Sequence, residues 1–218
     1  MPSLVHRLKE ATELLGWRLP VTATLWLARP KYLVIARDLN KPLPPVPSLV
    51  TTRWTLLTER EIPNLCAADP GLDPADVRRR LDDGQECHMG WVGEELAHYR
   101  WETTRPTMLP YLGKVLRPRP GQVCGCGAFT APGFRRLGIH TESSILALHR
   151  KRERGMRTAI HFVAWWHRPS RRVYLERAGC RLAGSIGYWN LGLGRRFFTE
   201  GTVRLDLSLI HISEPTRH

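Results

Sequence analysis

The chain has 218 residues, of which 42% are hydrophobic, so it can fold around one buried core without disulfides or a structural metal. Its 33 Lys and Arg residues exceed 20 Asp and Glu, and the net charge of +13 favours nucleic acid, anionic lipid or phosphate-rich ligands without choosing among them. Five cysteines lack C-x-x-C spacing. We therefore predict no disulfide framework, no metal site and a reducing, cytoplasmic location.

The N-terminal part of the chain predicts an extension. Residues 4–15 carry an apolar helical stripe, and the uncharged run 19–28 is too short to cross a bilayer. Residues 31–39 predict a strand that ties the extension down. The proline-rich segment 41–48 cannot continue a helix or a central strand. We predict that residues 1–49 are an accessory element, which either packs against the main domain or contacts a membrane peripherally.

Regular elements follow the proline-rich segment. Asp73 and Pro74 suit the N-cap and first helical positions of a helix. The predicted elements of this part are a strand over 51–58, helices over 59–68 and 73–81, and a hairpin of strands over 86–92 and 96–103.

The second half of the chain continues the alternation of helices and strands. We predict strands over 123–130, 158–166, 181–191 and 197–205, with helices over 141–154 and from Pro169 to Gly179. A strand, loop, helix and strand in succession over 123–166 indicate a parallel crossover. Residues 50–206 are therefore predicted to form one α/β domain.

The last residues have an unusual composition. Residues 207–217, LSLIHISEPTR, coincide with the translation of a transposon-end adaptor used in preparing sequencing libraries. We predict that the genuine reading frame ends after Asp206 and that 207–218 are an adaptor-derived tail. The true C-terminal sequence stays open.

The loop before the predicted helix 141–154 has the composition of a phosphate-binding loop. Gly133 and Gly138 permit close approach of the backbone, and free N–H groups at a helix start attract anions. Arg135 and Arg136 add charged donors. The stretch is neither a Walker loop nor a three-glycine dinucleotide fingerprint.

The sequence RRLGIH, residues 135–140, resembles the Arg/Gln-x-x-Gly-x-Gly/Ala signature of the GNAT superfamily of N-acetyltransferases. The preceding CGAFTAPGF and the later HRPSRRVYLERAGC, residues 167–180, also resemble family segments. The likeness extends over about 51–205. It implies a GNAT-like, mixed and mostly antiparallel twisted sheet flanked by helices. His140, His167 and Cys180 depart from the family pattern.

The resemblance also implies a site. Acetyl-coenzyme A, or another acyl-coenzyme A, would be the cosubstrate, with its pyrophosphate in the signature loop and its pantetheine arm along the preceding strand. The residues implied to bind it are Phe129, Thr130, Arg135, Arg136, Leu137, Gly138, Ile139, His140 and Thr141.

Catalytic residues are less sharply indicated. Counting forward from His167 places the family's general-acid tyrosine at Tyr174, whereas counting back from Gly179 places it at Leu175. Glu102 is the first candidate for a general base and Glu142 the second. His140 and His167 are further candidates for a direct role.

The implied activity is acyl-coenzyme A-dependent N-acyl transfer, most simply of acetyl to a primary amine by direct attack. A second reading is transfer of a longer chain from acyl-coenzyme A or an acyl-carrier protein. A third is a non-enzymatic basic module on nucleic acid or membrane, with nucleic acid the less favoured partner. The acceptor, whether a small molecule or a protein amine, and the oligomeric state are left open.

Overall fold

A computed structural model describes residues 29–109, 112–190, 195–201 and 206–209, the last of these by backbone only. The strands are β1 (Lys31–Asp38), β2 (Arg53–Leu56), β3 (Glu86–Val92), β4 (Glu95–Thr103), β5 (Thr107–Leu109), β6 (Lys114–Arg117), β7 (Gln122–Thr130), β8 (Thr158–Ala164), β9 (Arg181–Asn190), β10 (Arg195–Gly201) and β11 (Asp206–Leu209). The helices are η2 (Glu59–Glu61), α3 (Ile62–Ala68), α4 (Pro74–Asp82), η3 (Pro132–Phe134), α5 (Ile139–Glu153), α6 (Arg168–Arg172) and η4 (Val173–Arg177).

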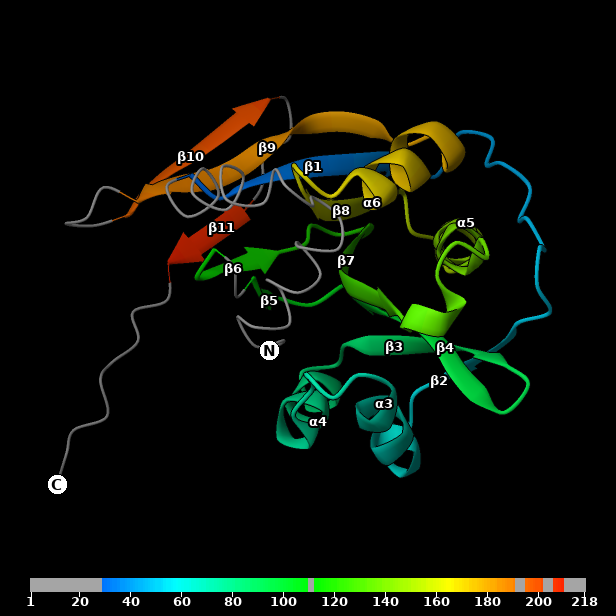
Figure 1. Cartoon of the computed structure of the whole chain (residues 1–218). Coiled ribbons are helices and arrows are strands. Elements are labelled where there is room, and N and C mark those ends of the chain that lie inside the picture. Colours follow the sequence, from blue (N-terminus) through cyan, green and yellow to red (C-terminus); the bar gives the residue numbers. More distant parts are fainter. Residues whose placement is uncertain (1–28, 110–111, 191–194, 202–205, 210–218) are drawn as a thin grey trace, which may run out of the picture.

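The centre of the fold is an eight-stranded sheet in the order β10-β9-β1-β8-β7-β4-β3-β2 (Figure 1). The β7–β8 pair is parallel and the other neighbouring pairs are antiparallel. The predicted crossover over 123–166 is therefore confirmed. A smaller sheet has the order β11-β6-β5.

Helices cover both faces of the large sheet, and β4 shows how the sequence divides them. Tyr99 and Trp101 pack into a cluster with residues of α3 and α4, including Leu65 and Val77. The residue between them, Arg100, contacts Tyr174 of η4 instead. Because successive strand residues point to opposite faces, α3 and α4 lie on one side of the sheet, and α5 and η4 on the other.

Most predicted elements are present within a few residues of their expected bounds. Asp73 caps α4 as expected, since its side chain accepts a 2.9 Å hydrogen bond from the Ala75 N–H. The short strands β5, β6 and β11 were not predicted. The predicted helix over 4–15 lies outside the described residues. Among the helices that the structure does describe, none is long and apolar enough to cross a membrane.

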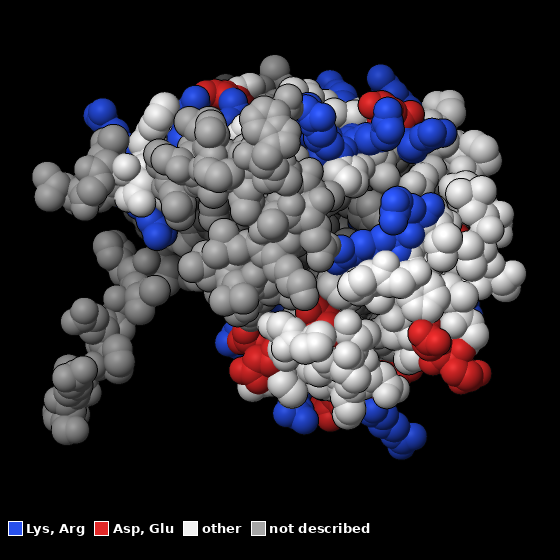
Figure 2. Space-filling view, in the orientation of Figure 1, with Lys and Arg blue, Asp and Glu red and all other residues white. Residues whose placement is uncertain are grey.

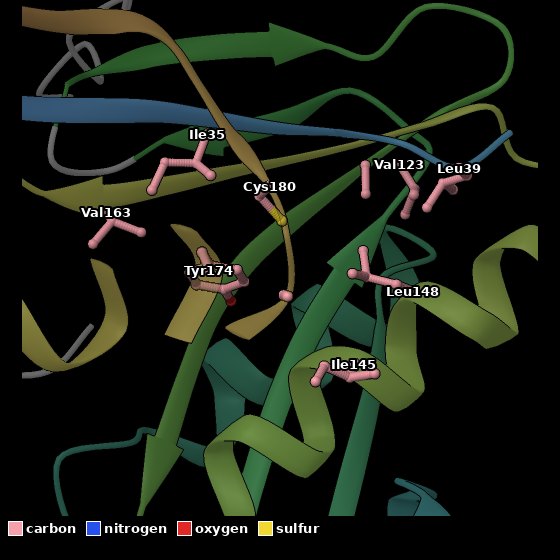
Figure 3. Packing of buried hydrophobic residues seen from close by; sticks show 10 residues of the cluster. Ile35, Leu39, Val123, Ile145, Leu148, Val163, Tyr174 and Cys180 are labelled. Atoms are coloured by element: carbon pink, nitrogen blue, oxygen red, sulfur yellow. The ribbon is translucent and has the colours of Figure 1, made fainter. Parts of the chain in front are cut away.

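The strand predicted over 31–39 is present as β1, but it is not peripheral. β1 lies between β8 and β9 and pairs with both. Ile35 and Leu39 are fully buried in the cluster beneath α5, together with Val123, Leu148 and Tyr174 (Figure 3). β1 is therefore part of the large sheet, although it precedes the boundary predicted at 49/50. The accessory role of residues 1–49 stays a prediction.

The proline-rich segment forms a strap between β1 and β2 that passes outside α5 (Figure 1). The backbone carbonyl of Pro44 lies 2.9 Å from Nε2 of His149 on α5. Leu43 packs against the buried cluster, and Leu49 reaches Gly138 at the start of the same helix. The strap thus follows α5 from its C-terminal half back to its first turn.

The C-terminal end of the described chain carries β11. Its backbone pairs antiparallel with β6, with Asp206 opposite Arg117 and Leu209 opposite Lys114. Residues 207–209 fall within the segment that we attribute to adaptor sequence, and 210–218 lie outside the described residues. That attribution stays a prediction.

Candidate functional site

The two parallel strands at the centre of the sheet, β7 and β8, separate halfway along β7. The β7–β8 ladder runs from Gln122 opposite Thr158 to Gly125 opposite His161. Beyond this point β7 continues to Thr130, paired only with β4 in the described part of the chain, and Gly127 and Ala128 are exposed. Because a strand in a sheet uses its backbone groups on both edges, this half of β7 has backbone donors and acceptors for an extended ligand.

The loop after β7 turns sharply into the first turn of α5. Arg136 has a φ of 68° and Gly138 a φ of 81°, both in the left-handed region. The first hydrogen bonds of the helix run from the N–H groups of Thr141 and Glu142 to the Gly138 carbonyl, at 2.9 and 3.0 Å. The N–H groups of Ile139 and His140 therefore precede the helical ladder and are suited to an anion.

Gly138 is constrained by its backbone and by the strap. A left-handed φ disfavours residues with a Cβ. A Cβ at this position would also meet the side chain of Leu49, which is 72% exposed. The nearest neighbour of such a Cβ is therefore the strap.

The two arginines of the loop have different environments. Arg135 is half-buried, and its Nε donates a 3.3 Å hydrogen bond to the Thr130 carbonyl, which ties the loop to the end of β7. Arg136 is exposed, as are Arg168 and Arg172 of α6. Lys and Arg side chains gather on both sides of a recess in the face shown in Figure 2. This charge favours a phosphorylated ligand.

The segment that carries Tyr174 contains a π-helical turn, η4. The Ala178 N–H bonds the Val173 carbonyl at 2.8 Å, five residues back. A π-turn holds one residue more than an α-turn. One extra residue in this segment would shift the two counts, to Tyr174 and Leu175, by one position. Tyr174 is buried, with 6% of its surface exposed.

Tyr174 lies close to the point where β7 and β8 separate. Its ring stacks on His161 at 4.3 Å, and the His161 ring sits directly over Gly125, the last β7 residue of the ladder. His140 meets Tyr174 edge to face at 5.9 Å. The structure therefore brings Tyr174 and His140 together beside the separating strands.

Three histidines in this region are held neutral. Burial, with the charges of Arg100 and His167, lowers the pKa of His140 to about 3. Burial is also the main cause that holds the pKa values of His98 and His161 well below their usual value. None of the three is therefore an imidazolium at neutral pH.

His167 has a structural role in α6. Its Nδ1 accepts a 3.2 Å hydrogen bond from the Ser170 N–H and so caps the helix. The Ser170 hydroxyl in turn lies 3.5 Å from Nε2 of His140, which links the starts of α6 and α5. A catalytic role for His167 stays a prediction.

Glu102 does not have the environment expected of a general base. β4 is an interior strand and Glu102 is only 5% exposed. Its Oε1 lies 2.9 Å from both Arg100 Nε and Lys151 Nζ. Burial alone raises the pKa of this carboxyl, but Lys151 and Arg100 outweigh it and the pKa lies below its usual value. A carboxylate held in this way is a weak base.

Glu142, the second candidate base, joins the first turn of α5 to β2. One carboxylate oxygen accepts a 2.8 Å hydrogen bond from Trp54 Nε1, and the other lies 3.3 Å from Thr52 Oγ1. These contacts, which the sequence pattern does not reveal, give Glu142 a structural function.

A recess of about 580 Å³ lies on the other side of the sheet, between α3 and the β3–β4 hairpin. Ala131 and Phe134, from the loop after β7, form part of its wall. Three carboxylates, from Glu61, Glu94 and Glu95, line it together with one arginine, Arg53, so this recess has an excess of negative charge on a strongly basic protein.

Together, the separated parallel strands, the left-handed loop and the helix start define a protein with a GNAT-like fold. A solved structure assigned to the GNAT family has the same fold. The predicted fold class is thereby confirmed.

One solved neighbour is assigned to the GNAT family of acetyltransferases in Novosphingobium aromaticivorans, with a TM-score of 0.52 and 18% identity. The match covers 73% of this chain and 62% of that protein's chain. A ribosomal-protein-alanine N-acetyltransferase from Brucella melitensis biovar Abortus has a TM-score of 0.45 and 14% identity, and the match covers 59% of this chain and 91% of that one. A Bacillus subtilis acetyltransferase in complex with coenzyme A has a TM-score of 0.42 and 21% identity, and the match covers 58% of this chain and 74% of that one. The sequence matches no protein-family model and no curated protein.

Proposed function

We propose that the protein is an acyl-coenzyme A-dependent N-acyltransferase that transfers an acetyl group to a primary amine by direct attack. The observation that carries the proposal is the half of β7 beyond Gly125. It has available backbone groups and leads straight into a glycine-bent loop and a helix start. A thioester arm with a pyrophosphate at its other end matches this arrangement of an extended edge beside an anion site.

The loop and the strand would bind different parts of the coenzyme. The N–H groups at the start of α5 would hold the pyrophosphate, and Arg136 would add charge. Backbone groups of β7 near Phe129 and Thr130 would pair with the arm, and one N–H there would polarise the thioester carbonyl. The neutral amine attacks the carbonyl carbon and the carbon–sulfur bond breaks. Tyr174 then protonates the departing thiolate, and the proton of the amine leaves to solvent.

The acidic recess is our candidate for the acceptor site. Carboxylates attract a protonated amine, and the wall formed by Ala131 and Phe134 places the recess next to the loop after β7. This position favours a cationic acceptor.

Ligand binding gives the first test of the proposal. Thermal unfolding is measured with acetyl-, octanoyl- and free coenzyme A. At a hundredfold excess over Kd, a bound ligand stabilises the folded protein by about 2.7 kcal/mol. For a chain of this size we expect a rise in Tm of roughly 5–10 °C. A larger rise with octanoyl-coenzyme A would favour the longer chain, and no rise with any of the three would refute the proposal.

Turnover gives the second test. Acetyl-coenzyme A is incubated with spermidine, kanamycin, tryptamine and L-alanine, and the products are examined by mass. We expect one acetyl group to be added to at least one amine. Binding to DNA that collapses with added salt, without any acetylated product, would instead support the non-enzymatic module.

Substitution of Gly138 is expected to weaken coenzyme A binding. A side chain at this left-handed position costs about 1–3 kcal/mol of backbone strain. We expect Gly138→Ala to raise the Kd for coenzyme A about tenfold by calorimetry, and Gly138→Val to raise it further.

The same loop supplies the control. Gly133 is exposed, and nothing lies within 4 Å of a Cβ placed there. Gly133→Ala should leave the Kd unchanged within about twofold. Adding Leu49→Ala to Gly138→Ala removes the obstructing strap side chain, so a Kd restored to the wild-type value would assign the effect to Leu49 rather than to the backbone.

A further inference from the structure

The hydroxyl of Tyr174 has a charged neighbour that the sequence pattern does not indicate. Arg100, on β4, is 2% exposed. It lies opposite Ala128, in the half of β7 that does not pair with β8. Its Nη2 donates to the Tyr174 hydroxyl oxygen at 3.4 Å. Because a guanidinium can only donate, the tyrosine oxygen is the acceptor and its own hydrogen is left to point elsewhere.

The charges around this contact are unbalanced. Arg100 and Lys151 are both buried cations, and both lie 2.9 Å from the same carboxylate oxygen of Glu102. Nη1 of Arg100 is buried without a hydrogen-bond partner among the described residues. Buried charges are normally paired. This cluster would therefore gain from a second negative charge beside Arg100.

The neighbouring rings narrow the choice of proton donor. His161 stacks on the Tyr174 ring and His140 meets its edge, and burial keeps both imidazoles neutral. Neither of the two rings that contact Tyr174 is therefore an imidazolium at neutral pH. The tyrosine hydroxyl carries a transferable proton, and the phenolate left behind would meet a buried cation.

We propose that Arg100 is a positioning residue for Tyr174, which orients the hydroxyl towards the departing thiolate and stabilises the phenolate that is left. This inference rests on the proposed acyltransferase function. When the carbon–sulfur bond breaks, the sulfur takes the bonding electrons and the Tyr174 proton. Arg100 then faces the phenolate, and the proton released by the amine returns to the tyrosine through solvent.

A double-mutant cycle tests the coupling. Initial rates are measured with acetyl-coenzyme A and the fastest of the four amines, and coenzyme A affinity is measured by calorimetry. We expect Tyr174→Phe to lower kcat about 100-fold and Arg100→Met about 30-fold, within the usual contribution of an acid catalyst. Arg100→Lys, which retains the charge, should lose only about threefold. The Kd for coenzyme A should stay within about twofold in all three.

The decisive variant combines Arg100→Met with Tyr174→Phe, and we expect its kcat to equal that of Tyr174→Phe alone. A structural role for Arg100 would instead lower kcat by the same factor in both backgrounds and overturn the inference. If Arg100→Met fails to fold, the cycle is run with Arg100→Lys, whose threefold loss must vanish in the Tyr174→Phe background.

Controls separate this inference from the function on which it rests. Arg154 is an exposed arginine paired with Glu86, and Arg154→Met should keep the wild-type kcat. Wild-type kcat in Tyr174→Phe would overturn the role of Arg100 while leaving an acyltransferase. Absence of acyl transfer by the wild type, with coenzyme A still bound, would refute the proposed function itself and the inference with it.

Discussion

A chain that begins at Ser48 is expected to show no cooperative unfolding transition, because it lacks β1. Without β1, the paired edges of β8 and β9 would be exposed. The truncation also removes five buried hydrophobic side chains from the core, those of Ala36 and of four larger residues: Tyr32, Val34, Ile35 and Leu39. At about 2 kcal/mol each, the four larger side chains contribute roughly 8 kcal/mol, comparable to the whole stability of a typical domain. Circular dichroism and urea titration measure the result.

A chain that begins at Arg29 is the matched control. It keeps β1 and the strap, and we expect it to unfold cooperatively. A sigmoidal urea transition in the Ser48 chain would show that the other strands form a stable sheet without β1, and would support the accessory role predicted from the sequence.

Acid is expected to destabilise the protein well before its carboxylates titrate. His98 and His161 are 1% and 2% exposed, and burial holds their pKa values far below the value of about 6.5 in an unfolded chain. Below pH 6.5 the unfolded state therefore binds protons that the folded state does not. Stability rises with pH wherever the unfolded state binds more protons, so it must fall as the pH drops through this range.

The size of the acid effect follows from the same linkage. Between pH 7.5 and 5, each of these two histidines should remove about 2 kcal/mol from the free energy of unfolding. Glu102 adds a loss at lower pH, because its pKa is depressed and its stabilising contribution disappears as the folded carboxylate is protonated. Urea midpoints at pH 7.5 and 5 measure the total.

Single substitutions assign the acid effect to its source. His98→Gln keeps a neutral hydrogen-bonding side chain and should reduce the loss by about 2 kcal/mol. Ser144→Ala, a buried residue of α5 that does not titrate, should leave the loss unchanged. Equal urea midpoints at the two pH values in the wild type would contradict the assignment of neutral, buried histidines.

The candidate site was only partly readable from the sequence. The order of a strand, a glycine-containing loop and a helix was enough to locate the loop at Gly138, because each signal lies within a few neighbouring residues. The buried environment of Glu102 could not be predicted from the sequence. Its partner Lys151 is 49 positions away on α5, and no local pattern connects the two. The contact between Arg100 and Tyr174, 74 positions apart, was missed for the same reason.

The sequence by itself determined the kinds and approximate bounds of most helices and strands, since alternation, caps, prolines and glycines act over a few residues. Only the tertiary structure decided that β1 enters the sheet between β8 and β9. Strand pairing joins residues that are distant in the chain, and an apolar strand such as KYLVIARD fits equally well at an edge or in the interior. Which position it takes depends on the strands that flank it, and the buried charges beneath α5 depend in turn on that arrangement.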